Sequence, residues 1–109
     1  MTGQPVVPRS LAVRDVDEAL NHYLTEASTQ VALGFINALE TGYVHIGSYP
    51  ATGSLRYAHA LNLPGLRCWA LGNYPYLVFY LERESYIDVW RVLHGKRDIP
   101  NWLHEAKNP

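Results

Sequence analysis

The chain has 109 residues and a net charge of −1, and 48% of its residues are hydrophobic. This length is enough for one domain spanning residues 1–109, because a chain of this size buries about two-thirds of its surface on folding. The near-neutral charge argues against a general nucleic-acid-binding protein, which needs an excess of cations to neutralise phosphates.

Cysteine and histidine content limits the chemistry that the chain can carry. The single Cys68 excludes an intramolecular disulfide and a cysteine-based zinc site, and its mid-strand position favours a small buried apolar role. His22, His45, His59 and His104 lack the spacing of metal ligands. No apolar run reaches the length of a membrane span, and residues 1–9 lack the apolar stretch of a secretion signal. We therefore expect a cytoplasmic protein without a metal or cofactor.

The N-terminal segment predicts an edge strand followed by a helix. A strand across Val6–Val13 is confined to a sheet edge by Pro5 and Pro8, because proline donates no ladder hydrogen bond. Asp15 and Glu18 have the spacing of a capping box, so the first helix is expected to begin at Asp15. Its apolar side chains recur with helical period at Val16, Leu20, Tyr23, Leu24 and Ala27.

A second amphipathic helix follows after a very short break. The hydroxyls of Ser28 and Thr29 are suited to cap its start, and Pro50 ends it. Its apolar stripe consists of Val31, Phe35, Ala38, Leu39, Gly42, Tyr43 and Ile46. Gly34 either lets the two helices approach closely or is a neutral surface glycine. The two helices are expected to form an antiparallel hairpin.

The second half predicts three strands and a short final helix. The strands cover Leu66–Leu71, Tyr76–Glu82 and Tyr86–His94, and their short connections favour antiparallel neighbours. One face of this sheet is expected to pack on the hairpin, and the other is either covered or left partly exposed for a partner. Asp98 with Pro100 has the pattern of an N-cap and first turn of the last helix.

Charge differs between the two halves. Residues 1–54 hold two basic and five acidic side chains, whereas residues 55–103 hold six basic and four acidic ones. The sheet and C-terminal segment are therefore expected to form the more positive end of the molecule.

Four segments carry a resemblance to a known family. They are Gly65–Arg67, Tyr74–Tyr80 (YPYLVFY), Val89–Gly95 (VWRVLHG) and Arg97–Pro100 (RDIP). Their order and composition resemble the ParE branch of the RelE/ParE toxins, and the helical segments Asp15–Glu18 with Tyr23 and Phe35–Glu40 are similar to that family's hairpin. The resemblance covers nearly the whole chain, from Val6 to Leu103.

The resemblance implies a fold and a function. The fold is α+β, with an N-terminal helical hairpin packed on a small antiparallel sheet and a short C-terminal helix. The function is that of a type II toxin that inhibits DNA gyrase by protein–protein contact, without enzymatic activity. A ParD-like antitoxin neutralises such toxins in a hetero-oligomer. An apolar groove for an amphipathic helix or an added strand fits that behaviour.

Eight residues are candidates for these contacts. Target-binding or signature roles are expected for Arg67, Arg91, His94, Arg97 and Trp102, and antitoxin contact is expected for Tyr23, Phe35 and Tyr80. Arg67 and Arg91 also suit ordinary surface ion pairs with Glu82 or Asp88, and Asp98 suits a cap.

Two alternatives remain open. RelE-type relatives cleave messenger RNA on the ribosome, which needs a general base, a cation and an acid, and Arg67, Arg91 and His94 are the candidates. Strand alternation, however, places Arg91 and His94 on opposite faces unless a bulge intervenes. The second alternative is a degenerate, non-toxic relative that only binds an antitoxin.

Overall fold

The computed structural model describes residues 3–96 and 99–107, with side chains described as far as residue 103. In chain order the elements are β1 (Val6–Pro8), α1 (Ser10–Glu26), α2 (Thr29–Ser48), the 3-10 turn η1 (Pro50–Thr52), α3 (Arg56–Leu61), β2 (Arg67–Ala70), β3 (Tyr76–Glu82), β4 (Ile87–His94) and α4 (Ile99–Lys107). The α+β class and the short C-terminal helix are confirmed, while the cap expected at Asp98 lies outside the described residues.

The sheet has four strands in the order β1-β4-β3-β2. β2, β3 and β4 are antiparallel neighbours, as their short connections predict, with Trp69 opposite Val78 and Leu77 opposite Leu93. β1 lies at the edge beside β4 but runs parallel to it, with Val6 opposite Ile87. The sheet is therefore mixed, because the chain enters it before the hairpin and returns in the same direction in β4.

The first helix begins five residues earlier than expected. α1 starts at Ser10 after Arg9, an extended residue whose side chain makes no cap hydrogen bond. Asp15 lies within the helix and is buried, so the predicted capping box is wrong. Leu24, expected on the apolar stripe, is 47% exposed. The spacing of Asp15 and Glu18 gave the wrong helix start because the actual partner of Asp15 is far away in the sequence.

The second helix begins as expected. The Ser28 hydroxyl accepts a hydrogen bond from the Val31 amide at 3.1 Å. Gly34 does not serve the approach of the two helices. A β-carbon there would lie 2.3 Å from the Tyr74 hydroxyl oxygen, so this glycine makes room for a side chain from the β2–β3 turn.

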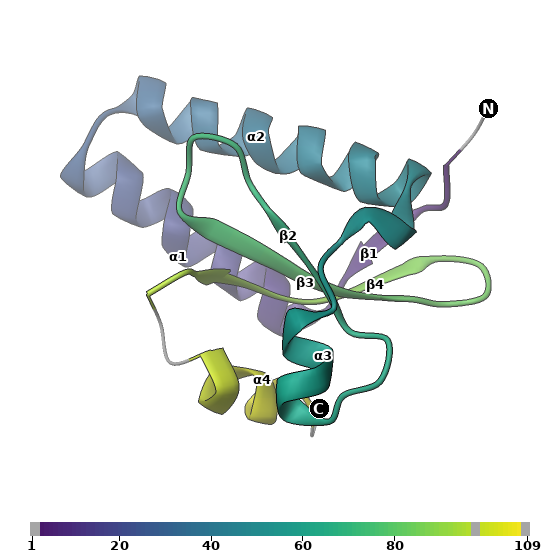
Figure 1. Cartoon of the computed structure of the whole chain (residues 1–109). Coiled ribbons are helices and arrows are strands. Elements are labelled where there is room, and N and C mark those ends of the chain that lie inside the picture. The colour runs from purple at the N-terminus through teal and green to yellow at the C-terminus, as the bar shows by residue number, and fades with distance from the viewer. Residues whose placement is uncertain (1–2, 97–98, 108–109) are drawn as a thin grey trace.

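Both faces of the sheet are covered (Figure 1). α1 and α2 lie along one face, and α3 with α4 on the other. The hairpin-side core contains Ala12, Ala19, Phe35, Leu39, Ile46, Leu71, Val78, Tyr80, Ile87, Val89 and Val92. The α4-side core contains Ala58, Leu63, Leu66, Phe79, Trp90, Leu93, Ile99 and Leu103. A broad apolar sheet face left open for a partner is therefore absent from the described residues.

A bulge in β4 changes which residues share a face. Phe79 lies opposite Arg91 and Tyr80 opposite Val89, so Trp90 is the extra residue. Val89 and Val92 consequently point into the same core, although strict alternation separates them. Because the bulge precedes Arg91, that residue and His94 still point to opposite faces, as predicted.

Candidate functional site

A groove runs between α2 and the edge strand β2, with a volume of about 620 Å³. It is called the α2–β2 groove, and its lining residues are Gly34, Asn37, Ala38, Thr41, Gly42, His45, Trp69, Ala70, Leu71, Gly72, Asn73 and Tyr74. Gly34, Ala38 and Gly42 follow one another at four-residue spacing, so they form a row of small residues along one helix face. The groove follows α2 from residue 34 to residue 45, a length of about 17 Å at 1.5 Å per residue.

Aromatic side chains wall this groove. The rings of His45 and Trp69 stack with centroids 4.1 Å apart, and His45 Nε2 lies 2.9 Å from the Thr52 hydroxyl. The Tyr74 hydroxyl donates to the Val31 carbonyl oxygen at 2.9 Å. These contacts join both sides of the groove, so its shape is defined before any partner arrives.

The groove has no Asp, Glu, Lys or Arg among its described lining residues. Apolar faces and a few neutral groups such as Asn37, Thr41 and Asn73 remain. Such a lining suits an apolar protein segment with occasional hydrogen bonds. It does not suit a charged substrate.

The outer edge of β2 is only partly available. Ser54 forms a bridge with Cys68, with both backbone hydrogen bonds at 2.9 Å. Ala70, two residues further along, is exposed and points its backbone groups to the same outer side, because alternate residues of a strand share a hydrogen-bonding edge. A partner strand therefore has room near Ala70 but not along all of β2.

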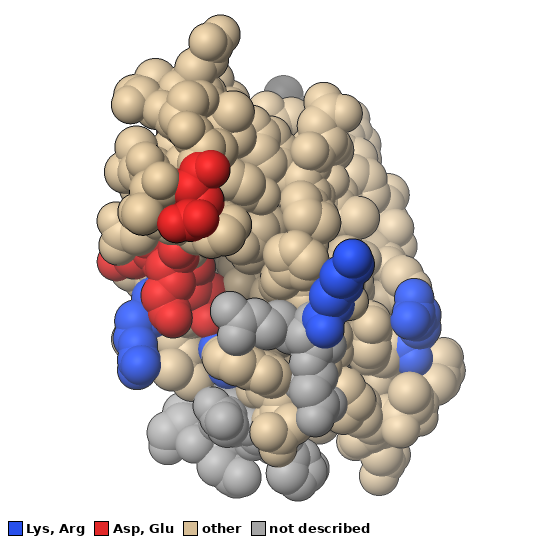
Figure 2. Space-filling model, turned by 90° about the vertical axis from the view of Figure 1, so that its left-hand side faces the viewer, with Lys and Arg blue, Asp and Glu red and all other residues tan. Residues whose placement is uncertain are grey.

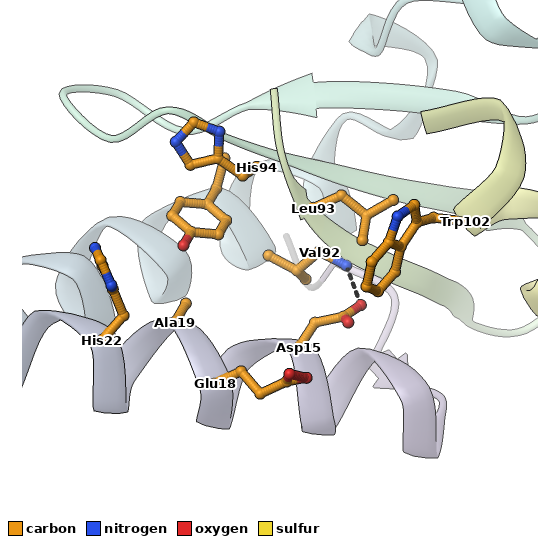
Figure 3. Close-up of a pocket in the computed structure, with 9 residues that line it drawn as sticks. Asp15, Glu18, Ala19, His22, Val92, Leu93, His94 and Trp102 are labelled. Carbon is orange, nitrogen blue, oxygen red and sulfur yellow. Dashed lines mark hydrogen bonds between the residues drawn. The ribbon is translucent and has the colours of Figure 1, made fainter. Parts of the chain in front are cut away.

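A second cavity of about 250 Å³ lies where α1 meets β4 (Figure 3). It is called the α1–β4 cavity, and it is lined by Asp15, Glu18, Ala19, His22, Tyr76, Val92, Leu93, His94 and Trp102. The rings of Tyr76 and His94 meet edge to face at 5.3 Å. The charged groups among the described residues of this lining are carboxylates, which disfavour a phosphodiester substrate.

A buried ion pair involves Asp15, one of the residues that line this cavity. Arg91 donates from Nε and Nη2 to the two carboxylate oxygens of Asp15, both at 2.7 Å, and the Val92 amide donates to Asp15 at 3.0 Å. Arg91 also donates to the Trp102 carbonyl oxygen at 3.0 Å, and its guanidinium lies 5.0 Å from the centroid of the Trp102 ring. One arginine thus connects α1, β4 and α4.

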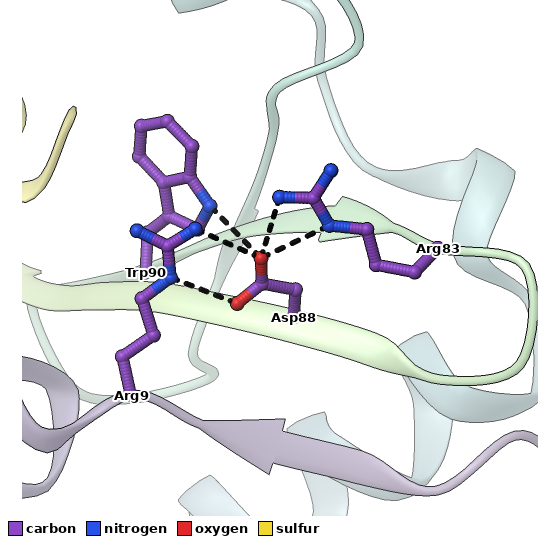
Figure 4. A network of polar contacts seen from close by, with 4 residues as sticks. All are labelled: Arg9, Arg83, Asp88 and Trp90. Atoms are coloured by element: carbon purple, nitrogen blue, oxygen red, sulfur yellow. Dashed lines mark hydrogen bonds and ion pairs between the residues drawn. The ribbon is translucent and has the colours of Figure 1, made fainter. Parts of the chain in front are cut away.

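A second ion-pair network lies at the other end of β4 (Figure 4). Arg9 and Arg83 both donate to the Asp88 carboxylate, at 2.9 to 3.1 Å, and the Trp90 indole N–H donates to it at 3.3 Å. Burial raises the pKa of Asp88, but the hydrogen bonds and charges of Arg9 and Arg83 lower it by more, so the net pKa lies below its usual value. The network fastens the chain before α1 and the β3–β4 turn to β4.

The sequence matches the profile described as "ParE toxin of type II toxin-antitoxin system, parDE" over residues 6–99. The chain belongs to the ParE toxin family. It is the toxin component of a type II toxin–antitoxin system. A solved structure entitled "Chromosomal ParDE TA system from P. aeruginosa" is similar in fold, with a TM-score of 0.70 and 18% sequence identity. The match covers 84% of this chain and 95% of that one. A sequence comparison with curated proteins finds no match.

The described signature residues of this ParE chain lie in two places, with Arg67 on β2 and with Arg91, His94 and Trp102 at the α1–β4 cavity. Arg67 donates to the Gly53 carbonyl oxygen at 2.8 Å, and Arg91 is 2% exposed in its pair with Asp15. His94 and Trp102 line the α1–β4 cavity, and Arg97 lies outside the described residues. The expected surface pairs of Arg67 and Arg91 with Glu82 or Asp88 are wrong, since both arginines have other partners. Arg67, Arg91 and His94 are not brought together, so the catalytic set expected of a RelE-type nuclease is not assembled from them.

Two of the three expected antitoxin contacts are corrected. Phe35 and Tyr80 are both 0% exposed, and the Tyr80 hydroxyl donates to the Pro50 carbonyl oxygen at 2.8 Å. Neither side chain can touch a partner without rearrangement of the core. Tyr23 is half-buried in an aromatic cluster with Phe35, Tyr74 and Tyr76, and it stays a candidate.

Sequence reasoning missed the groove and both ion-pair networks. Asp15 carried a usable signal, because a carboxylate falls between Ala12 and Ala19 on the buried stripe of α1 and therefore needs a buried cation. The small residues along α2 carried a weaker one. In the part of the chain that the structure describes, no three His, Cys, Asp or Glu side chains gather as a metal site, and no helix is long and apolar enough to span a bilayer.

Proposed function

We propose that this ParE-family toxin inhibits DNA gyrase by protein–protein contact, without chemistry of its own, and that a ParD-type antitoxin neutralises it from the α2–β2 groove. The observation that carries the antitoxin site is the uncharged, aromatic-walled groove along α2. The gyrase target rests on family membership.

The shape of the groove favours a helix over an added strand as the antitoxin segment. Gly34 and Gly42 already receive the side chains of Tyr74 and Leu71. A partner helix therefore packs over Ala38 and Thr41 between them, and about 17 Å of groove accommodates roughly three helical turns. A strand finds only the Ala70 end of the β2 edge, because Ser54 already pairs with Cys68. A segment that folds on binding buries large apolar area while staying degradable when free.

The absence of chemistry is supported by the arrangement of charges. Arg91 is held by Asp15, Arg67 is held by the Gly53 carbonyl, and His94 faces carboxylates of the α1–β4 cavity. A phosphorane needs an uncommitted cation beside the proton carrier, and these residues do not supply one.

A substitution in the groove tests the antitoxin site. Thr41→Arg places a long cationic side chain at an exposed position of the groove lining. The arginine blocks the apolar antitoxin segment, and binding of that segment would desolvate an unpaired charge. Calorimetric titration with the antitoxin should show affinity at least tenfold weaker. Val44→Arg is the matched control, since Val44 is 70% exposed on the same helix and does not line the groove. Equal loss in both variants, or in neither, contradicts this site.

Paired assays with purified protein test the target. Gyrase supercoiling should be blocked while messenger RNA on translating ribosomes stays intact. Cleaved messenger RNA with normal supercoiling favours the RelE-type nuclease. If neither assay responds and strong expression leaves growth unchanged, the degenerate, antitoxin-binding relative is favoured.

A further inference from the structure

The α1–β4 cavity carries features of a cation site that the proposed function does not use. Its volume of about 250 Å³ has room for roughly eight waters at about 30 Å³ each, enough for the planar end of one long side chain. It lies between α1 and the end of β4, with Glu18 and His22 on α1 and His94 on β4 (Figure 3).

One carboxylate of this cavity has no partner in the part of the chain that the structure describes. Asp15 is fully engaged by Arg91 and the Val92 amide. Glu18 is exposed, and within residues 3–96 and 99–103 it forms no ion pair or hydrogen bond, although Arg14 lies one turn before it. Among the described residues, the cavity therefore holds one carboxylate that no ion pair neutralises.

Aromatic groups complete the cation-binding character. Tyr76, His94, His22 and Trp102 contribute rings to the lining beside Glu18. A guanidinium suits such a site better than an ammonium, because it stacks on rings and donates two parallel hydrogen bonds to a carboxylate. Arg91 already shows this pairing of a guanidinium with a ring and a carboxylate, since it contacts Trp102 and Asp15, which both line the cavity.

Charges of both signs lie near Glu18. Asp17 directly precedes it on α1 and Arg14 lies one turn before it, both exposed, and Figure 2 shows a patch of acidic side chains on one flank with a basic side chain at its border. The acidic patch favours a basic group over a phosphate.

We propose that the α1–β4 cavity is a recognition pocket for an arginine side chain of a partner protein, with Glu18 pairing the guanidinium and the surrounding rings stacking on it. The inference rests on the proposed function only for the class of partner, a protein. The pocket lies apart from the α2–β2 groove, since the two linings share no residue.

A nuclear magnetic resonance titration of the full chain tests the pocket directly. The probe is N-acetyl-arginine amide, and its neutral isostere N-acetyl-citrulline amide is the matched ligand control, both at pH 8 and low salt. Backbone amides of residues 15–22 and 92–94 should shift with the arginine probe, with apparent affinity at least fivefold above that for citrulline.

Two variants make the outcome decisive. Glu18→Gln should remove the preference for arginine, while Glu40→Gln, an exposed change on α2 outside both linings, should keep it. Both variants should keep the wild-type melting temperature, because both positions are exposed. Equal responses to the two probes, shifts away from these residues, or an unchanged preference in Glu18→Gln would overturn the proposal. None of these readouts depends on gyrase inhibition, so the two proposals fail separately.

Discussion

At the scale of single residues, the titration of Asp88 couples the stability of the fold to pH. Its pKa is lowered in the folded chain by Arg9 and Arg83, against the opposing effect of burial. A carboxylate with a lowered folded pKa stabilises the protein above its unfolded pKa of about 4, and this contribution is lost as the pH falls through the folded value.

Replacing Asp88 should therefore reduce the acid sensitivity of the fold. Asp88→Asn leaves Arg9 and Arg83 facing each other and should cost about 3 kcal/mol of unfolding free energy at pH 7. Urea unfolding should show a smaller loss of stability between pH 5 and pH 2 in the variant than in the wild type. Asp17→Asn, an exposed change, should reproduce the wild-type profile. An unchanged pH profile in Asp88→Asn would refute the lowered pKa.

The thiol of Cys68 is predicted to react slowly. Burial raises the pKa of its thiol to about 11, with Arg56 nearby offsetting only part of the effect. At pH 8 a thiol of that pKa is about 0.1% thiolate, whereas an ordinary cysteine is about a quarter thiolate. Reaction with an aromatic disulfide reagent at pH 8 should therefore be at least 100-fold slower in the native chain than in urea. Comparable rates in the two conditions would contradict this account.

At the scale of elements, the ion pair between α1 and β4 is the contact that positions the hairpin. Asp15 and Arg91 are both buried, so loss of one partner leaves a charge in a site that cannot solvate it. Asp15→Asn should lower the unfolding free energy by about 3 to 5 kcal/mol in urea denaturation. Asp17→Asn on the same helix should change it by less than about 0.5 kcal/mol. Similar losses in the two variants would show that the pair does not hold these elements together.

The elements that could be predicted from the sequence are those with local signals. Tyr76–Glu82 was expected as a strand and is β3, and the Ser28 cap marks α2 correctly, because turn residues and hydroxyls act within a few positions. The predicted start of α1 was wrong because the actual start has no side-chain cap. Asp15, which has the spacing of a cap, instead pairs with Arg91, 76 residues away. A pattern of neighbouring residues cannot reveal a contact between residues so far apart in the sequence.

The candidate site was predictable only in part, for a related reason. His94 and Trp102 were expected as signature residues and do line one cavity. The α2–β2 groove was not expected, because its floor is defined by small side chains of α2 that matter only once β2 lies beside them. The helix α3 was also missed, since it has only six residues, its N-cap residue Leu55 makes no cap hydrogen bond, and Ala58 is buried by tertiary packing.

At the scale of the whole molecule, one sheet serves two cores. Phe79 belongs to the α4-side core, while its neighbours Val78 and Tyr80 belong to the hairpin-side core. Successive side chains of β3 therefore contribute to the two cores in turn. Arg91 adds a polar link, since it reaches Asp15 on α1 and the Trp102 carbonyl on α4. If one core loses its packing, the sheet that also supports the other core becomes exposed to solvent on that face.

This sharing predicts a single cooperative unfolding transition. Leu103 is 0% exposed in α4, and Leu103→Ala should cost about 2 to 5 kcal/mol by leaving a cavity against the sheet. The loss should appear as a lower urea midpoint with an unchanged slope, because the whole chain still unfolds at once.

Two optical signals can detect a departure from that behaviour. Trp90 and Trp102 report the α4 side, Trp69 reports the α2–β2 groove, and far-ultraviolet circular dichroism reports all helices. In Leu103→Ala the fluorescence and dichroism transitions should coincide, as they should in Ile46→Ala, the matched change in the hairpin-side core. If the α4-side fluorescence is lost at lower urea than the dichroism, α4 detaches on its own and the shared sheet does not couple the two cores.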